Sequence, residues 1–227
     1  MKIILFGATG MIGQGVLREC LQAADVEAVL AVGRTELSFN HPKLVQWVRS
    51  DLFDYGIEAE RFRDFDACFF CLGTSSTAGT EVEYTRLNYE LPVAVGKAIA
   101  KVNPDLIFVY VSADGADSTQ NGKIMWARVK GKTENALQNL GLRATYAFRP
   151  GIIIPLNGAV SKTRSYRLMY RLFGWVFALV RVWRPELILD TERMGLAMLQ
   201  VARRGNITSI VEAESIHRLA VESELRW

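Results

Sequence analysis

Short apolar runs alternate with amphipathic segments along the first two thirds of the chain. The apolar runs predict strands over Ile3–Phe6, Val26–Val32, Leu44–Val48, Ala67–Cys71, Leu106–Val111 and Ala144–Phe148. The segments between them predict helices over Gly10–Ala24, Val82–Val102 and Met125–Asn139. Continuously apolar strands are typical of a parallel sheet with helices on both faces. The alternation therefore predicts an α/β fold built on a doubly wound parallel sheet.

The first strand runs directly into a glycine-rich turn and the start of a helix. Gly7, Gly10 and Gly13 stand three residues apart, a spacing that differs from the GxGxxG of the commonest dinucleotide fingerprint. A helix N-terminus offers free N–H groups and the positive end of its dipole to a phosphate. Gly7 allows a tight turn, Gly10 allows the backbone to approach a pyrophosphate, and Gly13 allows the helix to lie close to the strand. We predict a dinucleotide site; the alternative is a turn whose glycines serve the backbone only.

The strand ends are expected to form one cleft. In a doubly wound sheet, ligands bind beyond the carboxyl ends of the strands. Residues 1–155 are therefore predicted to form an NAD(P)-binding Rossmann core. The alternation stops after about residue 155, and residues 156–227 are expected to form a small helical lobe packed on the same domain, for a substrate or a partner.

Composition narrows the class of protein. Half of the 227 residues are hydrophobic and 22% are charged, which indicates a globular chain and not a disordered one. The net charge of +3 is small for this length and indicates no nucleic-acid partner. Because the chain has only two histidines, no metal site is visible.

The cysteines and the apolar runs bear on the compartment. Three cysteines are typical of a reducing environment. Cys68 and Cys71 lie three residues apart on a predicted strand and point to opposite faces, so we expect inert core thiols. No signal peptide is visible, and the longest charge-free apolar run, Leu172 to Val180, is far shorter than the roughly 20 residues that span a bilayer. We therefore expect a cytoplasmic protein.

The residue after the second strand favours NADP(H) over NAD(H). An acidic residue there would bind the ribose 2′-hydroxyl of NAD, whereas an arginine accommodates a 2′-phosphate. Arg34 stands there, and its guanidinium can bind a phosphate through two hydrogen bonds. The alternative is a solvated loop arginine. Asp51, after the third strand, can accept a hydrogen bond from the adenine amino group, or it is a turn or cap residue.

Several motifs occur in the order found in one known superfamily. They are Gly7–Gly13, Gly33-Arg34, Asp51-Leu52, Cys71–Thr74, Asn88-Tyr89, Val111-Ser112, Val129–Gly131 and Arg149–Gly151. Together they resemble the short-chain dehydrogenase/reductase superfamily, and most closely its atypical branch of Tat-interacting-protein-like and epimerase/dehydratase-like members. The resemblance covers residues 1–155 well and the rest loosely.

The resemblance implies a cofactor site spread along the strand ends. Its residues would be Gly7, Thr9, Gly10, Met11, Ile12, Gly13, Arg34, Asp51, Leu52, Cys71, Leu72, Gly73, Lys130, Pro150, Gly151 and Ile152.

The resemblance also implies a serine, a tyrosine and a lysine at the nicotinamide end. Ser112 and Lys130 stand at the matching places, and Ser112 is alternatively a strand-end hydroxyl that satisfies the backbone. Trp126 occupies the place of the tyrosine, four residues before Lys130. An indole N–H donates a hydrogen bond but cannot act as an acid and base near neutral pH. Tyr110, Tyr84 or a water are the candidates to replace the missing acid.

The segment 162–184 combines basic and aromatic residues. It holds six basic residues and no acidic one, which leaves a net charge of −3 for the rest of the chain. Three interpretations stay open: a helix that covers the substrate pocket with its arginines directed outward, a homodimer interface, and a basic surface for peripheral membrane contact or an acidic partner. After it, Asp190–Ala202 is predicted to form another helix.

Three functions are compatible with these features. The first is an oxidoreductase that moves hydride between NADPH and a small hydrophobic carbonyl compound. The second is a non-catalytic sensor or scaffold that binds NADP(H), which Trp126 favours. The third is an epimerase or isomerase that retains NAD(P).

Overall fold

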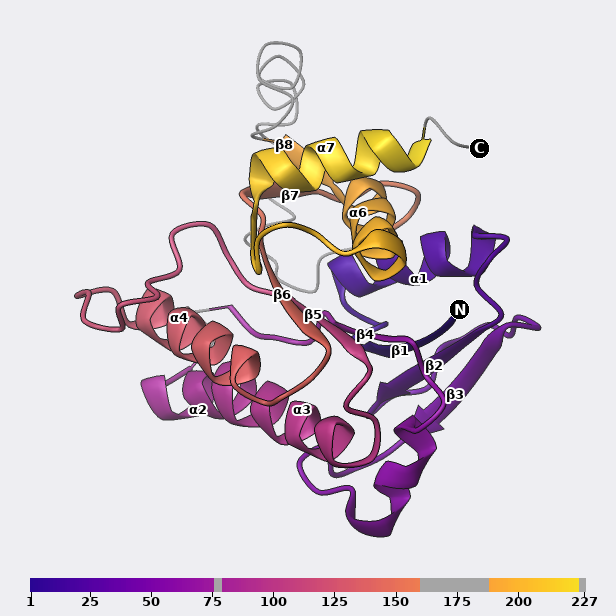
Figure 1. The fold of residues 1–227 in the computed structure, drawn as a ribbon, viewed down its shortest axis with the longest axis horizontal. Helices are drawn as coiled ribbons and strands as arrows, with labels where there is room; N and C mark the ends of the chain where they lie inside the picture. The colour runs from indigo at the N-terminus through magenta and orange to yellow at the C-terminus, as the bar shows by residue number, and fades with distance from the viewer. Residues whose placement is uncertain (76–78, 160–187, 225–227) are drawn as a thin grey trace.

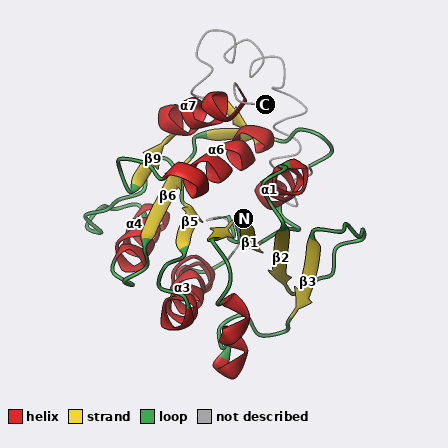
Figure 2. Cartoon of the chain, turned by 45° about the vertical axis from the view of Figure 1, so that its right-hand side comes forward, coloured by secondary structure: helices red, strands yellow, loops and turns green. Residues whose placement is uncertain are grey.

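A computed structural model describes residues 1–75, 79–159 and 188–224 of the chain. Its centre is a parallel sheet of seven strands in the order β3-β2-β1-β4-β5-β6-β9, with helices on both faces (Figures 1 and 2). The strands are β1 (Lys2–Phe6), β2 (Ala28–Gly33), β3 (Leu44–Val48), β4 (Ala67–Phe70), β5 (Ile107–Val111), β6 (Ala144–Arg149) and β9 (Ile210–Glu212), and a separate parallel pair is β7 (Ile152–Ile154) and β8 (Ile188–Asp190). The helices are α1 (Met11–Gln22), the 3-10 helix η1 (Gly56–Phe62), α2 (Glu81–Thr85), the π-helix η2 (Arg86–Glu90), α3 (Leu91–Val102), α4 (Met125–Gln138), α6 (Thr191–Arg204) and α7 (Ala213–Glu224).

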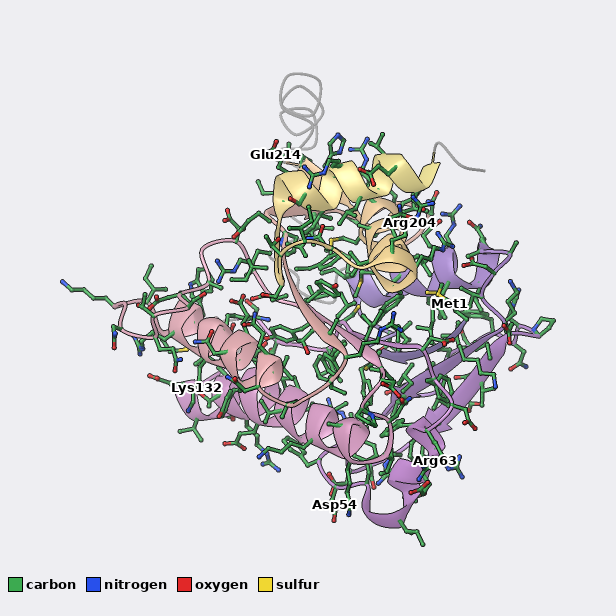
Figure 3. All side chains as sticks on the ribbon, in the orientation of Figure 1. Met1, Asp54, Arg63, Lys132, Arg204 and Glu214 are labelled. Carbon is green, nitrogen blue, oxygen red and sulfur yellow. The ribbon has the colours of Figure 1, made fainter. Side chains whose placement is uncertain are left out.

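The doubly wound parallel sheet is confirmed, and the six strands predicted from the sequence are β1 to β6, displaced by at most two residues at an end. Side chains alternate between two cores, as strand geometry requires. Ile3 and Leu5 of β1 lie in the core beneath α1, α6 and α7, whereas Ile4 and Phe6 lie in the core beneath η1, α3 and α4. Figure 3 shows Lys132 on α4 and Arg204 on α6, on opposite sides of the sheet.

The helix predicted over Val82–Val102 is interrupted by a π turn. Pro92 has no N–H with which to bond the carbonyl of Asn88, four residues earlier. The Asn88 carbonyl instead accepts hydrogen bonds from the hydroxyls of Tyr110, at 3.1 Å, and Thr133, at 2.8 Å. The Leu91 N–H reaches back five residues to the carbonyl at the start of η2, which is the hydrogen bond of a π-helix.

The described part of the C-terminal region packs on the N-terminal helix and extends the sheet. The helix predicted over Asp190–Ala202 is confirmed as α6, which lies against α1. The two helices touch at Gly15, where an added Cβ would lie 2.5 Å from the carbonyl oxygen of Thr191. β9 pairs with β6 in the main sheet. The segment 162–184 lies outside the described residues.

Candidate functional site

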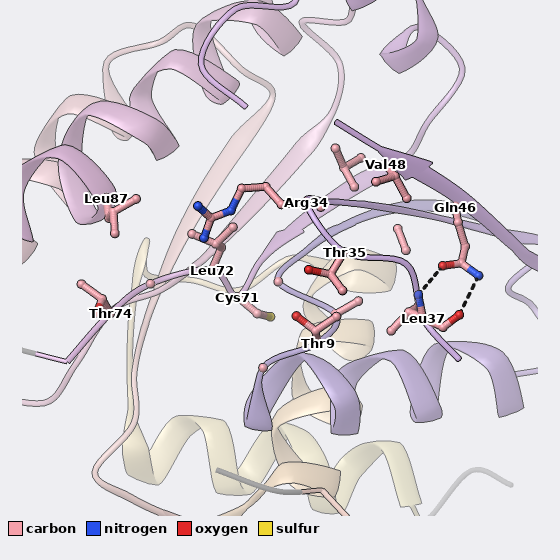
Figure 4. A pocket seen from close by; sticks show the side chains of 17 residues that line it. Thr9, Arg34, Thr35, Leu37, Gln46, Val48, Cys71, Leu72, Thr74 and Leu87 are labelled. Atoms are coloured by element: carbon pink, nitrogen blue, oxygen red, sulfur yellow. Dashed lines mark hydrogen bonds between the residues drawn. The ribbon is translucent and has the colours of Figure 1, made fainter. Parts of the chain in front are cut away.

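A pocket of about 290 Å³ opens where β1, β2 and β4 end (Figure 4). Its walls come from the turn after β1, the end of β2 with the loop that follows it, and the loop after β4. Strand ends that are distant in the sequence meet here, as predicted, but the ends of β5 and β6, which were expected in the same cleft, do not line the pocket. The lining residues are Gly7–Gly10, Ala31–Thr35, Leu37, Gln46, Val48, Cys71–Thr74 and Leu87.

The glycine turn leaves no room for side chains at two of its positions. Gly7 has a φ of +84°, and an added Cβ there would lie 2.7 Å from the Leu72 nitrogen. An added Cβ on Gly13 would lie 2.0 Å from the Gly7 carbonyl oxygen. Gly10 begins α1 without a side-chain cap, and no acidic residue lies in the first turn of the helix. The first N–H groups of a helix have no partner within the helix itself, so this turn brings potential donors to the edge of the pocket.

A second, more open pocket of about 610 Å³ adjoins the first and shares Arg34, Leu72 and Leu87 with it. Figure 4 shows the Arg34 side chain extending toward Leu72. Asp51 and Leu52 line this second pocket. The Asp51 carboxylate accepts a hydrogen bond from the Phe53 N–H at 2.8 Å, which is a turn contact.

At the ends of β5 and β6, the polar side chains bind one another. The Ser112 hydroxyl donates to a carboxylate oxygen of Glu134 at 2.5 Å. The Arg149 guanidinium donates to both oxygens of that carboxylate, at 3.0 and 2.6 Å, and these hydrogen bonds raise the pKa of Arg149. The Glu134 side chain is fully buried, and Arg149 also pairs with Glu212 at 3.3 Å and donates to the Ser118 hydroxyl at 2.6 Å.

Lys130 points into the protein interior. Its ammonium group donates to the Tyr110 hydroxyl at 3.0 Å and to the Val111 carbonyl at 3.1 Å. Burial lowers the pKa of Lys130 to about 8 and raises that of Tyr110 well above its ordinary value. Because the Tyr110 hydroxyl donates to the Asn88 carbonyl, its proton is already engaged. Tyr84, the other tyrosine considered from the sequence, is buried as well.

Trp126 lies half-buried in the first turn of α4, four residues before Lys130. Its ring is 3.5 Å from the position that a Cβ on Gly115 would take. The chain after β6 approaches the same loop, because the Asp114 N–H donates to the Pro150 carbonyl at 3.1 Å.

The structure thus divides the predicted site residues into two groups. The two pockets gather Gly7, Thr9, Gly10, Arg34, Asp51, Leu52, Cys71, Leu72 and Gly73. Neither pocket is lined by Met11, Ile12, Gly13, Ser112, Lys130, Pro150, Gly151 or Ile152.

Sequence reasoning missed several lining residues. Gln46 holds the loop after β2 by accepting a hydrogen bond from the Leu37 N–H at 2.7 Å, and an amide in an otherwise apolar strand was its only signal. Arg86 and Phe53 line the second pocket, and no motif marked either of them.

Cys20, Cys68 and Cys71 are free thiols, and burial raises the pKa of each. Within residues 1–75, 79–159 and 188–224, no group of His, Cys, Asp or Glu side chains could hold a metal ion. No helix in the same ranges is long and apolar enough to cross a membrane.

No family model matches the chain. Among curated proteins, it is 30% identical over 164 residues to the protein FMP52-2, mitochondrial, of Scheffersomyces stipitis, which covers 71% of this chain and 69% of that protein. It is 27% identical over 179 residues to fmp52, mitochondrial, of Emericella nidulans, which covers 76% and 74% of the two chains.

Two solved structures illustrate the fold. WbmF of Bordetella bronchiseptica in complex with NAD+ matches with a TM-score of 0.68 and 15% identity, over 99% of this chain and 77% of that one. A short-chain dehydrogenase/reductase family oxidoreductase of Burkholderia thailandensis matches with a TM-score of 0.65 and 18% identity, over 99% and 96%. These similarities confirm the Rossmann fold, which is the fold that the resemblance to short-chain dehydrogenases/reductases implied.

The expectation of a cytoplasmic protein is wrong. FMP52 relatives from five fungi are mitochondrial proteins by name. That expectation depended on the lack of a visible signal peptide and of an apolar span, and neither feature separates cytoplasmic proteins from mitochondrial ones.

Proposed function

Because the chain belongs to the FMP52 protein family and has the fold of short-chain dehydrogenases/reductases, we propose that it binds NADP(H) at the ends of β1, β2 and β4. The observation that carries the proposal is the 290 Å³ pocket, in which the glycine turn, Arg34 and the loop after β4 face one another. The absence of space for a Cβ at Gly7 and Gly13 supports a backbone built for close approach.

Each part of the dinucleotide would have its own residues. The turn from Gly7 to Gly10 and the start of α1 would hold the pyrophosphate through backbone N–H groups. Arg34 would bind the 2′-phosphate, and the second pocket, beside Leu52, would receive the adenine. The loop after β4, from Cys71 to Gly73, would lead toward the nicotinamide half, where the resemblance implies Lys130 and the chain after β6.

Bound NADPH supplies a hydride. The contacts of the residues at the β5–β6 end favour a protein that binds NADP(H) but does not transfer the hydride to a substrate. A substrate carbonyl needs a hydrogen-bond donor, but the Ser112 hydroxyl gives its proton to Glu134. The Lys130 ammonium is engaged with Tyr110 and Val111. Trp126 offers no acid at the position of the tyrosine. Of the functions considered, a sensor or scaffold that responds to NADP(H) is therefore the one that we propose.

Titration calorimetry with NADPH and NADH tests the cofactor. We expect NADPH to bind tightly and Arg34→Ala to weaken it about tenfold or more without changing NADH binding. Arg204→Ala is the matched control, because it removes the same charge from an exposed position on α6, across the sheet from α4 (Figure 3). If the wild-type protein binds neither nucleotide, the glycine turn is architecture only and the proposal fails.

Loss of NADPH absorbance with a panel of small hydrophobic aldehydes and ketones separates the functions. We expect no turnover above the blank for the wild-type protein or for Trp126→Tyr, because Ser112 remains bonded to Glu134 in both. Turnover restored by Trp126→Tyr would instead support an oxidoreductase that lost its acid. Nucleotide released from the purified protein by denaturation would support the epimerase interpretation.

A further inference from the structure

We infer that Arg86, on the pocket that Arg34 also lines, is a second arginine for the 2′-phosphate of NADP(H), and this inference rests on the proposed NADP(H) function. The two arginines reach the 610 Å³ pocket from separate elements. Arg34 follows β2, whereas Arg86 begins the π-helix η2. Both side chains are exposed, so a ligand can reach them.

The π turn and an aromatic ring fix the position of Arg86. Leu87, the next residue of η2, lines both pockets, so the start of the π turn forms the wall that they share. The central carbon of the Arg86 guanidinium lies 5.1 Å from the centroid of the Phe53 ring. A cation held over an aromatic face keeps its N–H groups free for an anion at the edge. Phe53 lines the same pocket and is half-buried.

The acidic residues of this pocket form no ion pair with either arginine. Asp51 and Glu83 both line it. The Asp51 carboxylate accepts the Phe53 N–H, and the Glu83 carboxylate accepts the Thr80 N–H at 2.8 Å in a capping box at the start of α2. Among the described residues, neither arginine has a carboxylate oxygen within 4.0 Å of its guanidinium.

Two unpaired guanidinium groups on one pocket suit a dianion. A phosphate monoester carries close to two negative charges near neutral pH, and arginine binds it through paired, charge-assisted hydrogen bonds. The ribose 2′-hydroxyl of NAD(H) carries no charge and would leave both arginines without a counterion. Arg86 is thus inferred to determine the choice between NADP(H) and NAD(H), together with Arg34.

Two fragments that differ only in the 2′-phosphate isolate this contact. Adenosine 2′,5′-bisphosphate and 5′-AMP are titrated by calorimetry into the wild-type protein, Arg86→Ala, Arg34→Ala and the double variant. We expect Arg86→Ala to lower the affinity for the bisphosphate about tenfold or more and the affinity for 5′-AMP less than twofold. The double variant should bind both fragments equally. The bisphosphate affinity of Arg86→Lys should lie between those of the wild-type protein and Arg86→Ala, since lysine keeps the charge but not the paired hydrogen bonds of arginine.

Controls distinguish this inference from the proposed function. Arg204→Ala should leave both fragments unaffected, and thermal unfolding of each variant should match the wild-type protein because both arginines are exposed. If Arg86→Ala weakens the two fragments equally or changes neither, while Arg34→Ala lowers NADPH affinity, this inference is wrong and the proposed function stands. If the wild-type protein binds neither NADPH nor NADH, both are wrong.

Discussion

The carboxyl edge of the sheet has two ends that differ in what their polar groups contact: a pocket at one end, and one another at the other end. At the open end, where β1, β2 and β4 end, the turn from Gly7 to Gly10 and the Arg34 side chain line open pockets. At the closed end, where β5 and β6 end, the Glu134 carboxylate accepts hydrogen bonds from Ser112 and Arg149. The topology is the same at both ends, because all of these strands are parallel neighbours in one sheet.

The difference shows that position at a strand end does not by itself leave a polar side chain available to a ligand. A buried ion pair repays the cost of leaving water only when hydrogen bonds satisfy both partners. Glu134 meets this condition with three hydrogen bonds, from Ser112 and Arg149. These bonds tie the ends of β5 and β6 to α4.

Removing Glu134 should produce the largest effect on stability. Glu134→Ala removes the buried carboxylate from the mostly buried Arg149 guanidinium and leaves it only the exposed Glu212, so we expect a loss of about 3–5 kcal/mol in the free energy of unfolding. Urea unfolding followed by circular dichroism measures it. Glu212→Ala is the matched control, since Glu212 pairs with the same arginine but its side chain is 53% exposed. That variant should lose at most about 1 kcal/mol. Equal losses in the two variants would contradict the division into a closed and an open end.

Two glycine substitutions should lower the free energy of unfolding to a similar extent but should differ in their effect on NADPH affinity. An added Cβ on Gly13 would meet the Gly7 carbonyl oxygen, and one on Gly131 would lie 1.8 Å from the Asp117 carbonyl oxygen. Each alanine variant should therefore lose about 1–3 kcal/mol of the free energy of unfolding. Only Gly13→Ala should also lower the affinity for NADPH, because only it displaces the turn of the open end. Gly33→Ala is the stability control, since the nearest atom to its added Cβ is 4.0 Å away. A similar loss of NADPH affinity in Gly131→Ala would show that NADPH binding depends on the packing of α4 as much as on the glycine turn.

The open end could be predicted because its signals are local in the sequence. The apolar run of β1, the spacing of Gly7, Gly10 and Gly13, and the arginine after β2 each lie within a few residues. The helix start and the strand ends follow from that pattern and from the topology of parallel sheets.

The Glu134 network, the π turn and β9 could not be predicted, because they depend on contacts between residues that are distant in the sequence. Glu134 lies 22 residues from Ser112 and 15 from Arg149, so no local pattern marks their network. The π turn needed Pro92 together with hydroxyls from Tyr110 and Thr133, and without it the position of Arg86 was not predictable. β9 has only three residues and is defined by its pairing with β6.

The pH dependence of stability should give the smallest effect and tests how closed the β5–β6 end is. Burial lowers the pKa of Lys130 from 10.5 to about 8, so between these pH values the unfolded chain holds a proton that the folded chain lacks. The free energy of unfolding therefore rises with pH in this window. Between about pH 8 and 9.5, the free energy of unfolding of the wild-type protein should rise by at most about 2 kcal/mol more than that of Lys130→Met. Urea unfolding at each pH measures both. Lys132→Met, two residues along α4 at an exposed position, should follow the wild-type curve. A constant difference between wild type and Lys130→Met across the window would mean that Lys130 is solvated, and the β5–β6 end would then be open as well.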